Sequence, residues 1–126
     1  RMVTLYQIAG SVGGIVVGTG NKVEDYGVGF YTKYGDGGVD IAPIADLYKT
    51  EVWELGKHLN LDKRIIDAKP TDGLWNDGRT DEDQIGASYE DLEYAMEHGN
   101  GPAVRILHDY NCKNKHKMNP IPTFKL

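Results

Sequence analysis

The sequence predicts an α/β protein in which helices flank a parallel sheet, and three neighbouring features predict it. Apolar residues over Met2–Ala9 recur with the spacing of one helix face. Ile15–Val17 is a short run of β-branched residues, as in a strand that is buried on both faces of a parallel sheet. The run passes directly into the turn Gly18-Thr19-Gly20, and ligands of such sheets bind beyond the carboxyl ends of the strands. Thr19 therefore stands at an expected ligand position.

The middle of the chain predicts helices separated by one polar loop. Apolar residues that advance by three or four predict an amphipathic helix from about Ile44 to Asn60. A short helical turn is expected over Lys63–Asp67, and the polar segment Lys69–Arg79 has the composition of a turn-rich loop.

The last third of the chain predicts three helices and a tail. Thr80 and Ser88 are placed to cap helices that begin near Asp81 and Tyr89, and Gly99 to Gly101 ends the second of them. Pro102 suits the first position of a third helix, which is expected through Tyr110. A basic and then proline-rich tail is expected over Lys113–Pro122. The chain as a whole is therefore expected to be helix-rich.

Composition limits the classes of function. The formal net charge is -5 and no lysine- and arginine-rich run occurs, which argues against a nucleic-acid partner. No apolar run approaches the length that spans a membrane, and the lone Cys112 cannot form an intramolecular disulfide, so a cytoplasmic location is expected. The chain has the length of one domain or part of one. Because it begins at Arg1 within a predicted helix, it is expected to be part of something longer.

The segment Gly18–Asp40 predicts the functional site. Seven of its 23 residues are glycine, and glycine costs roughly 0.5–1 kcal/mol in a regular element relative to alanine. The charged residues between the glycines are of the types that bind phosphates and metal ions: Lys22, Glu24, Asp25, Lys33, Asp36 and Asp40. The alternative is a solvated surface loop.

Candidate ligands follow from residue type and spacing. Glu24 and Asp25 follow the glycine turn within one loop, where a carboxylate can coordinate Mg²⁺ while Thr19 contacts a nucleotide. Lys33 and Lys49 are candidate phosphate partners, although a lysine on an amphipathic helix is also an ordinary solvated side chain. The pair His116-Lys117 can bind an anion or can belong to an exposed terminus.

Seven segments, taken in order along nearly the whole chain, resemble the sequences of one known family: Val17–Glu24, Thr32–Gly38, Asp40–Ile44, Leu47–Val52, Pro70–Trp75, Arg79–Gly86 and His116-Lys117. The family is that of the NAD synthetases, in particular the ammonia-dependent type. The resemblance implies an adenine-nucleotide alpha hydrolase-like (ATP pyrophosphatase) fold, of which residues 1–126 would be the C-terminal portion of a single domain.

The resemblance also implies an activity and its participants. NAD synthetases form an adenylate from ATP and deamido-NAD (nicotinic acid adenine dinucleotide), release pyrophosphate, and let ammonia displace AMP to give NAD. Mg²⁺ is the implied cofactor, and a homodimer is the implied assembly. The residues implied are, for ATP, Thr19, Lys49 and Thr71; for deamido-NAD, Lys33, Asp40, His116 and Lys117; and for the metal, Glu24. No catalytic residue is assigned.

One family motif does not occur in this sequence. Family members carry a Ser-Gly-Gly-x-Asp-Ser loop that holds pyrophosphate, and Gly10-Ser11-Val12-Gly13-Gly14 lacks its Asp-Ser. Alone, the chain is therefore expected to be inactive. Two alternatives remain: a non-catalytic nucleotide-binding or dimerisation fragment of such an enzyme, or a related adenylating amidotransferase, against which the segment Thr32–Asp40 argues.

Overall fold

The computed structural model describes residues 1–125 and consists mainly of helices. In chain order the elements are α1 (Met2–Val12), the π-helix η1 (Val23–Val28), α2 (Lys49–His58), α3 (Lys63–Ile66), α4 (Asp81–Ile85), α5 (Tyr89–His98) and α6 (Val104–Met118). The helix-rich character expected from the sequence is confirmed.

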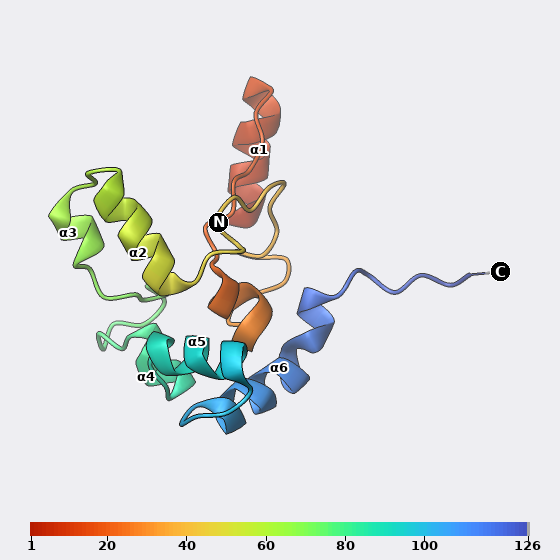
Figure 1. Cartoon of the computed structure of the whole chain (residues 1–126). Helices are drawn as coiled ribbons and strands as arrows, with labels where there is room; N and C mark the ends of the chain where they lie inside the picture. The colour runs from red at the N-terminus through yellow and green to blue at the C-terminus, as the bar shows by residue number, and fades with distance from the viewer. Residues whose placement is uncertain (126) are drawn as a thin grey trace.

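The helices are arranged around η1 (Figure 1). α5 and α6 pack against η1 and against each other, while α2 and α3 form a hairpin beside them. α1 projects at the opposite end, and the chain after α6 extends away from the helices (Figure 1). Within residues 1–125, no helix is both long and apolar enough to cross a membrane.

The hydrophobic core lies where η1, α4, α5 and α6 meet. Its buried residues are Val23, Val28, Ile85, Tyr89, Leu92 and Ala103. Tyr89 and Leu92 of α5 have no exposed surface, so α5 presents a fully buried face to this core. Ser88 caps α5 by accepting a hydrogen bond from the Asp91 N–H group, and left-handed Gly99 ends it, as the sequence predicts.

The expected strand Ile15–Val17 is reduced to one contact. Among the described residues the β-structure is an isolated parallel bridge between Val17 and Ile41. Val16 is buried, with 7% of its surface exposed, but Ile15 and Val17 are 59% and 51% exposed. A strand is buried on both faces when it lies inside a sheet that helices cover on both sides, and among residues 1–125 only Ile41 forms a bridge with this segment. The expected parallel sheet is therefore not confirmed.

Two helix boundaries differ from the expectation. The helix expected from Ile44 begins at Lys49, because residues 43–47 form turns and Tyr48 has extended backbone angles. The helix expected to end near Tyr110 continues to Met118, so the first half of the predicted tail is helical. It is held there by contacts with η1, which the sequence did not predict.

α6 satisfies the carbonyl groups at the end of η1. Three side chains on one face of α6 donate to them: Asn111 to the carbonyls of Tyr26 and Gly27, Asn114 to Val28, and Lys117 to Gly29 and Tyr31. A π-helix leaves its last carbonyls without intrahelical partners, so α6 acts as its C-terminal cap.

Candidate functional site

The segment Gly18–Asp40 forms most of the lining of an open cavity of about 410 Å³, which we call the loop cavity. Four residues predicted for the site line it: Thr19, Glu24, Lys33 and Lys117. The first three come from the glycine-rich segment, and Lys117 comes from α6, more than 80 residues later. The fold therefore brings a metal-ligand candidate and two cations to the lining of one cavity.

Local sequence explains why Glu24 stands at the start of η1. The buried side chain of Asn21 accepts hydrogen bonds from the N–H groups of Val23 (3.0 Å) and Glu24 (3.2 Å). Asn21 thus caps the first turn of η1, as asparagine commonly does at the N-terminus of a helix. A Cβ atom on Gly20 would collide with the Asp25 carboxylate, so a side chain at this position would displace that carboxylate from its present place.

Glu24 and Lys49 form an ion pair beside the cavity. Lys49 Nζ lies 3.5 Å from Glu24 Oε1, and both side chains are largely buried. The Tyr89 hydroxyl donates to the same oxygen at 2.6 Å, and Lys49 Nζ lies 5.3 Å from the centre of the Tyr89 ring. Lys49 does not line the loop cavity, but the ion pair and the ring place its ammonium group next to the metal-ligand candidate.

Asp81 is a buried carboxylate in the same cluster. Only 7% of the residue is exposed, and its Oδ2 atom accepts a long hydrogen bond of 3.4 Å from the Tyr89 hydroxyl. Its Oδ1 atom is buried with no hydrogen-bond partner among the described residues. Burial raises the pKa of this carboxyl, the negative charge of Glu24 adds to the rise, and Lys49 opposes it.

Asp25 adds a second carboxylate to the cavity wall. Burial, followed by the charges of Glu24 and Asp36, raises its pKa to about 6. Asp36 also lines the cavity, and its carboxylate accepts a hydrogen bond from the Thr32 N–H group. Asp25 and Asp36 therefore line the cavity in addition to Glu24, the acidic residue to which the sequence assigned the metal.

Lys33 lies near the His116-Lys117 pair, and the contacts of both lysines are made to backbone carbonyl groups. Lys33 Nζ donates at 2.8 Å to the carbonyl of His116, whose side chain is exposed and outside the cavity lining. Lys117 Nζ donates to the carbonyls of Gly29 and Tyr31, and burial lowers its pKa. Both lysines are thus fixed at the cavity rim by carbonyl groups.

Asp40 and Thr71 do not line the loop cavity. The Asp40 carboxylate accepts from the Val16 N–H group at 2.8 Å and from the Tyr6 hydroxyl at 3.3 Å, so it joins α1 to the bridge segment. The Thr71 hydroxyl donates to the Arg79 carbonyl at 3.1 Å and accepts from the Gly73 N–H group.

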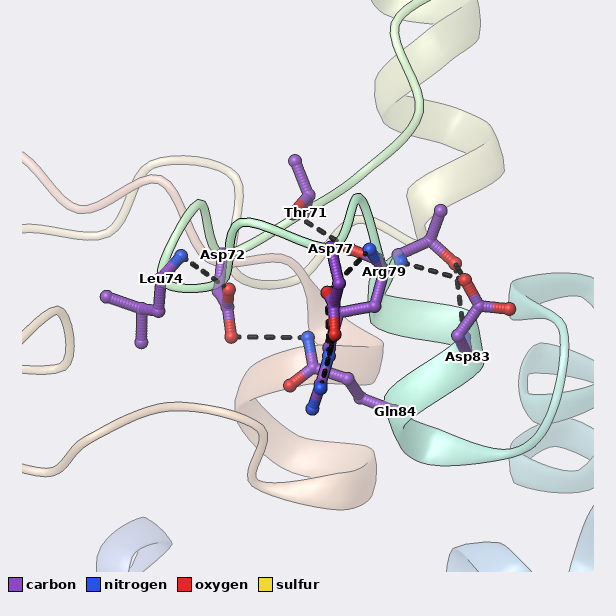
Figure 2. A network of polar contacts seen from close by, with 8 residues as sticks. Thr71, Asp72, Leu74, Asp77, Arg79, Asp83 and Gln84 are labelled. Carbon is purple, nitrogen blue, oxygen red and sulfur yellow. Dashed lines mark hydrogen bonds and ion pairs between the residues drawn. The ribbon is translucent and has the colours of Figure 1, made fainter.

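Thr71 belongs to a separate polar network in the loop before α4, which Figure 2 shows from close by. In this network Asp77 pairs with Arg79, and Asp72 accepts from the side chain of Gln84 on α4. The Arg79 guanidinium also stacks over the Trp75 ring at 4.5 Å. The loop is ordered by its own contacts and by α4, and it leaves Trp75 half exposed.

A larger cavity of about 800 Å³ adjoins the first. It shares several residues with the loop cavity, Thr19 and Lys117 among them, and reaches Leu5 of α1 and Lys113 of α6. Thr19 therefore stands at the junction of two spaces, one lined mainly by the glycine-rich segment and one reaching both terminal helices.

The cavity wall fits a magnesium ion that other groups help to hold. Mg²⁺ is usually bound by one or two carboxylates together with phosphate oxygens and water. Among residues 1–125, no three His, Cys, Asp or Glu side chains are grouped closely enough to hold a metal ion by themselves. Glu24, with Asp25 beside it, therefore fits as the protein part of a site that phosphate oxygens complete.

Two members of the cluster, Asp81 and Tyr89, were not predicted to act there. Both were expected only at the starts of helices. They come from helices that are far from the glycine-rich segment in sequence, so spacing carries no signal for them.

Comparisons with known proteins identify the family. The sequence model of the family described as NAD synthase matches residues 1–119. The NH₃-dependent NAD⁺ synthetase of Carboxydothermus hydrogenoformans is 44% identical over 119 residues, which cover 93% of this chain and 48% of that protein. The protein of the same name from Archaeoglobus fulgidus is 54% identical over 93 residues, 74% of this chain and 37% of that one.

Solved structures agree. NMN synthetase from Francisella tularensis superposes with a TM-score of 0.86 at 38% identity, covering 100% of this chain and 53% of that one. The NH₃-dependent NAD synthetase of Campylobacter jejuni superposes with a TM-score of 0.69 at 28% identity, covering 99% and 51%. This chain spans about half the length of these relatives or less. With its fold, its ordered motifs and the family match in agreement, the chain belongs to the NAD synthase family.

Proposed function

We propose that the full-length protein catalyses the ATP-dependent amidation of deamido-NAD to NAD. The observation that carries the proposal is the loop cavity, where Thr19, Glu24, Lys33 and Lys117 meet. Relatives that bear the name NH₃-dependent NAD⁺ synthetase support ammonia as the nitrogen donor.

The reaction explains the charges of this site. The nicotinate carboxylate attacks the α-phosphorus of ATP, the bond to the β-phosphate oxygen breaks, and pyrophosphate leaves with its electrons. Ammonia then attacks the adenylated carbonyl carbon, AMP leaves, and the nitrogen loses a proton to give the amide. Two anionic substrates must be held in line during the first step, and Lys33, Lys49 and Lys117 supply positive charge for it.

Mg²⁺ is the proposed cofactor and Glu24 its ligand from this chain. The metal ion would neutralise charge on the triphosphate. Glu24 is suited to it because its carboxylate is on the cavity wall, is already oriented by Tyr89, and has Lys49 to balance its charge. We keep Thr19, Lys49 and Thr71 as proposed ATP contacts, and Lys33, Asp40, His116 and Lys117 as proposed contacts of deamido-NAD.

A second candidate product is NMN, formed by amidation of nicotinic acid mononucleotide. It is favoured by the closer superposition and higher identity with the NMN synthetase than with the Campylobacter jejuni NAD synthetase. The chemistry at the carboxylate is the same in both reactions, so the two candidates differ only in whether the cavities receive an adenylate half.

The proposal also covers the domain and the assembly to which this chain belongs. Residues 1–126 are proposed to form the C-terminal portion of a single domain, with Val16-Val17 and Asp40-Ile41 joining a parallel sheet completed by the remainder of the protein. The exposed apolar side chains of Ile15 and Val17 support this, because a completed sheet would cover them. A homodimer in the cytoplasm is the proposed state.

A substrate comparison tests the proposal. Turnover of the full-length protein is measured with ATP, Mg²⁺ and ammonium, using deamido-NAD in one series and nicotinic acid mononucleotide in the other. The leading proposal expects the higher kcat/KM with deamido-NAD, and the second candidate expects the reverse. If folded protein that binds ATP converted neither acid, the non-catalytic alternative would be favoured.

A further inference from the structure

Glu93 of α5 reaches the first turn of α2, where Lys49 stands. Its carboxylate accepts two hydrogen bonds from Thr50, one from the backbone N–H group at 3.1 Å and one from the hydroxyl group at 2.7 Å. Only 9% of Glu93 is exposed. A buried anion is therefore bound to the residue that directly follows the lysine of the candidate site.

The start of α2 needs such an acceptor from outside. The first N–H groups of a helix have no partners within it, and short polar residues usually supply them. Tyr48 occupies this position in α2, and its hydroxyl stands at the far end of a ring. Glu51 turns back to accept from the Tyr48 N–H group at 2.7 Å, and Glu93 accepts from Thr50. The negative charge also complements the positive end of the helix dipole.

The same helix also contacts the other end of the lysine. Tyr89 precedes Glu93 by one helical turn, so both side chains lie on one face of α5. The Tyr89 ring lies 5.3 Å from Lys49 Nζ, and its hydroxyl orients the Glu24 oxygen that pairs with this ammonium group. α5 thus fixes the backbone beside Lys49 through Glu93 and its head group through Tyr89.

We propose that Glu93 is a positioning residue for Lys49, acting through Thr50 to hold the ammonium group where ATP phosphates bind. The proposal rests on the proposed function for the identity of the ligand. A residue that only stabilised the helix packing would change the stability of the protein without changing its ATP affinity. A positioning residue changes ATP affinity, and it does so only while Lys49 is present.

The test is a double-mutant cycle on ATP affinity, measured by titration calorimetry with the full-length protein in Mg²⁺. Glu93→Gln keeps the shape of the side chain but removes its charge and one acceptor oxygen. We expect it to weaken ATP binding roughly five- to tenfold, since hydrogen bonds to charged groups are about twice as strong as neutral ones. In the Lys49→Ala background the same change should have no further effect.

Matched variants complete the design. Glu97→Gln removes the same charge one turn further along α5, from an exposed side chain, and should bind ATP as the unmodified protein does. Thr50→Ser keeps both donors and should also bind normally, whereas Thr50→Val loses the hydroxyl donor and should weaken binding in the direction of Glu93→Gln. Thermal unfolding verifies that each variant is folded.

Three results would overturn the positioning role: normal ATP affinity in Glu93→Gln, losses that add in the double variant, or a change confined to thermal stability. Normal ATP affinity in Lys49→Ala would overturn it as well, because the lysine would then not bind ATP. Failure of the proposed function looks different. In that case the cycle shows coupling between Glu93 and Lys49 for ATP, but no amide forms from either acid.

Discussion

The hydroxyl group of Tyr89 donates a 2.6 Å hydrogen bond to Glu24 Oε1 and so joins α5 to η1 at the edge of the loop cavity. The Tyr89 ring is fully buried and meets Trp53 edge-on, with 6.2 Å between ring centres. Because the ring cannot move, the hydroxyl fixes one oxygen of Glu24 in place. The metal-ligand candidate is therefore oriented by the core of the protein.

Removing this hydroxyl should weaken the response to Mg²⁺. Tyr89→Phe keeps the buried ring and deletes the hydroxyl that donates to Glu24 at 2.6 Å and, over a longer distance, to Asp81. Groups that orient a metal ligand typically change metal affinity by about 10–100-fold, so we expect the Mg²⁺ concentration for half-maximal turnover to rise by roughly tenfold. A Mg²⁺ titration of the amidation rate measures it. Tyr94→Phe, on the exposed face of the same helix, is the control. An identical Mg²⁺ titration for Tyr89→Phe and the unmodified protein would contradict the role given to Tyr89.

Gly29 should not tolerate a side chain. Its φ angle is +66°, and a Cβ atom would stand 2.5 Å from the Cβ atom of Asn114 on α6. Gly29→Ala should lower the free energy of unfolding by roughly 2–4 kcal/mol, since left-handed strain and overpacking both act. Urea unfolding measures it.

Gly13→Ala separates the two causes. Gly13 has nearly the same φ angle, +67°, but nothing within 4 Å of the added atom. It should cost about 1 kcal/mol, which is the conformational part alone. Equal costs at the two positions would show that α6 does not press against η1 as described.

The Asp25 carboxylate should make stability depend on pH. Its pKa is about 6 in the folded protein against an ordinary value of 3.8, so the folded state binds this proton more tightly than the unfolded state. The ionised carboxylate therefore destabilises the protein fully above pH 6, and this penalty disappears as the pH falls to 3.8.

Asp25→Asn should accordingly stabilise the protein at pH 7.5 by about 1 kcal/mol, a value reduced for solvent screening because the group is only half buried. At pH 4 the gain should vanish. Urea unfolding in the presence of EDTA measures it without a metal contribution. Asp109→Asn, which changes an exposed carboxylate of α6, should show no such pH dependence. If Asp25→Asn changed the free energy of unfolding by the same amount at pH 4 and at pH 7.5, the raised pKa of Asp25 would be contradicted.

Local signals in the sequence predicted the helices well. Ser88 and Gly99 mark the ends of α5, and Thr80 with Asp83 marks the start of α4, because capping involves residues only a few positions apart. The π-helix η1 was not predicted. Its carbonyls are satisfied by side chains of α6, and Asn111 and Tyr26 are 85 positions apart, a distance over which periodicity carries no information.

The site residues divide in the same way, into those that lie in one local motif and those that helix packing brings to it. Thr19, Glu24 and Lys33 lie in one continuous motif, and the structure places them on one cavity. Tyr89 reaches Glu24 because α5 packs against η1, and Asp81 joins the cluster through Tyr89, so no spacing in the sequence predicts either role. The isolated bridge between Val17 and Ile41 has a related cause, since the burial predicted for Ile15–Val17 requires a covered sheet of several strands, and residues 1–125 supply one bridge partner.

The most direct test of the central claim follows the amide nitrogen. The full-length protein is incubated with ATP, Mg²⁺, deamido-NAD and ¹⁵N-labelled ammonium, and the products are analysed by mass spectrometry. We predict one ¹⁵N atom in the nicotinamide group of NAD, with AMP and pyrophosphate formed in equal amounts, and a strong loss of all three products in Glu24→Gln. Release of ADP and phosphate instead, or no labelled NAD from folded protein that binds ATP, would contradict the proposed reaction.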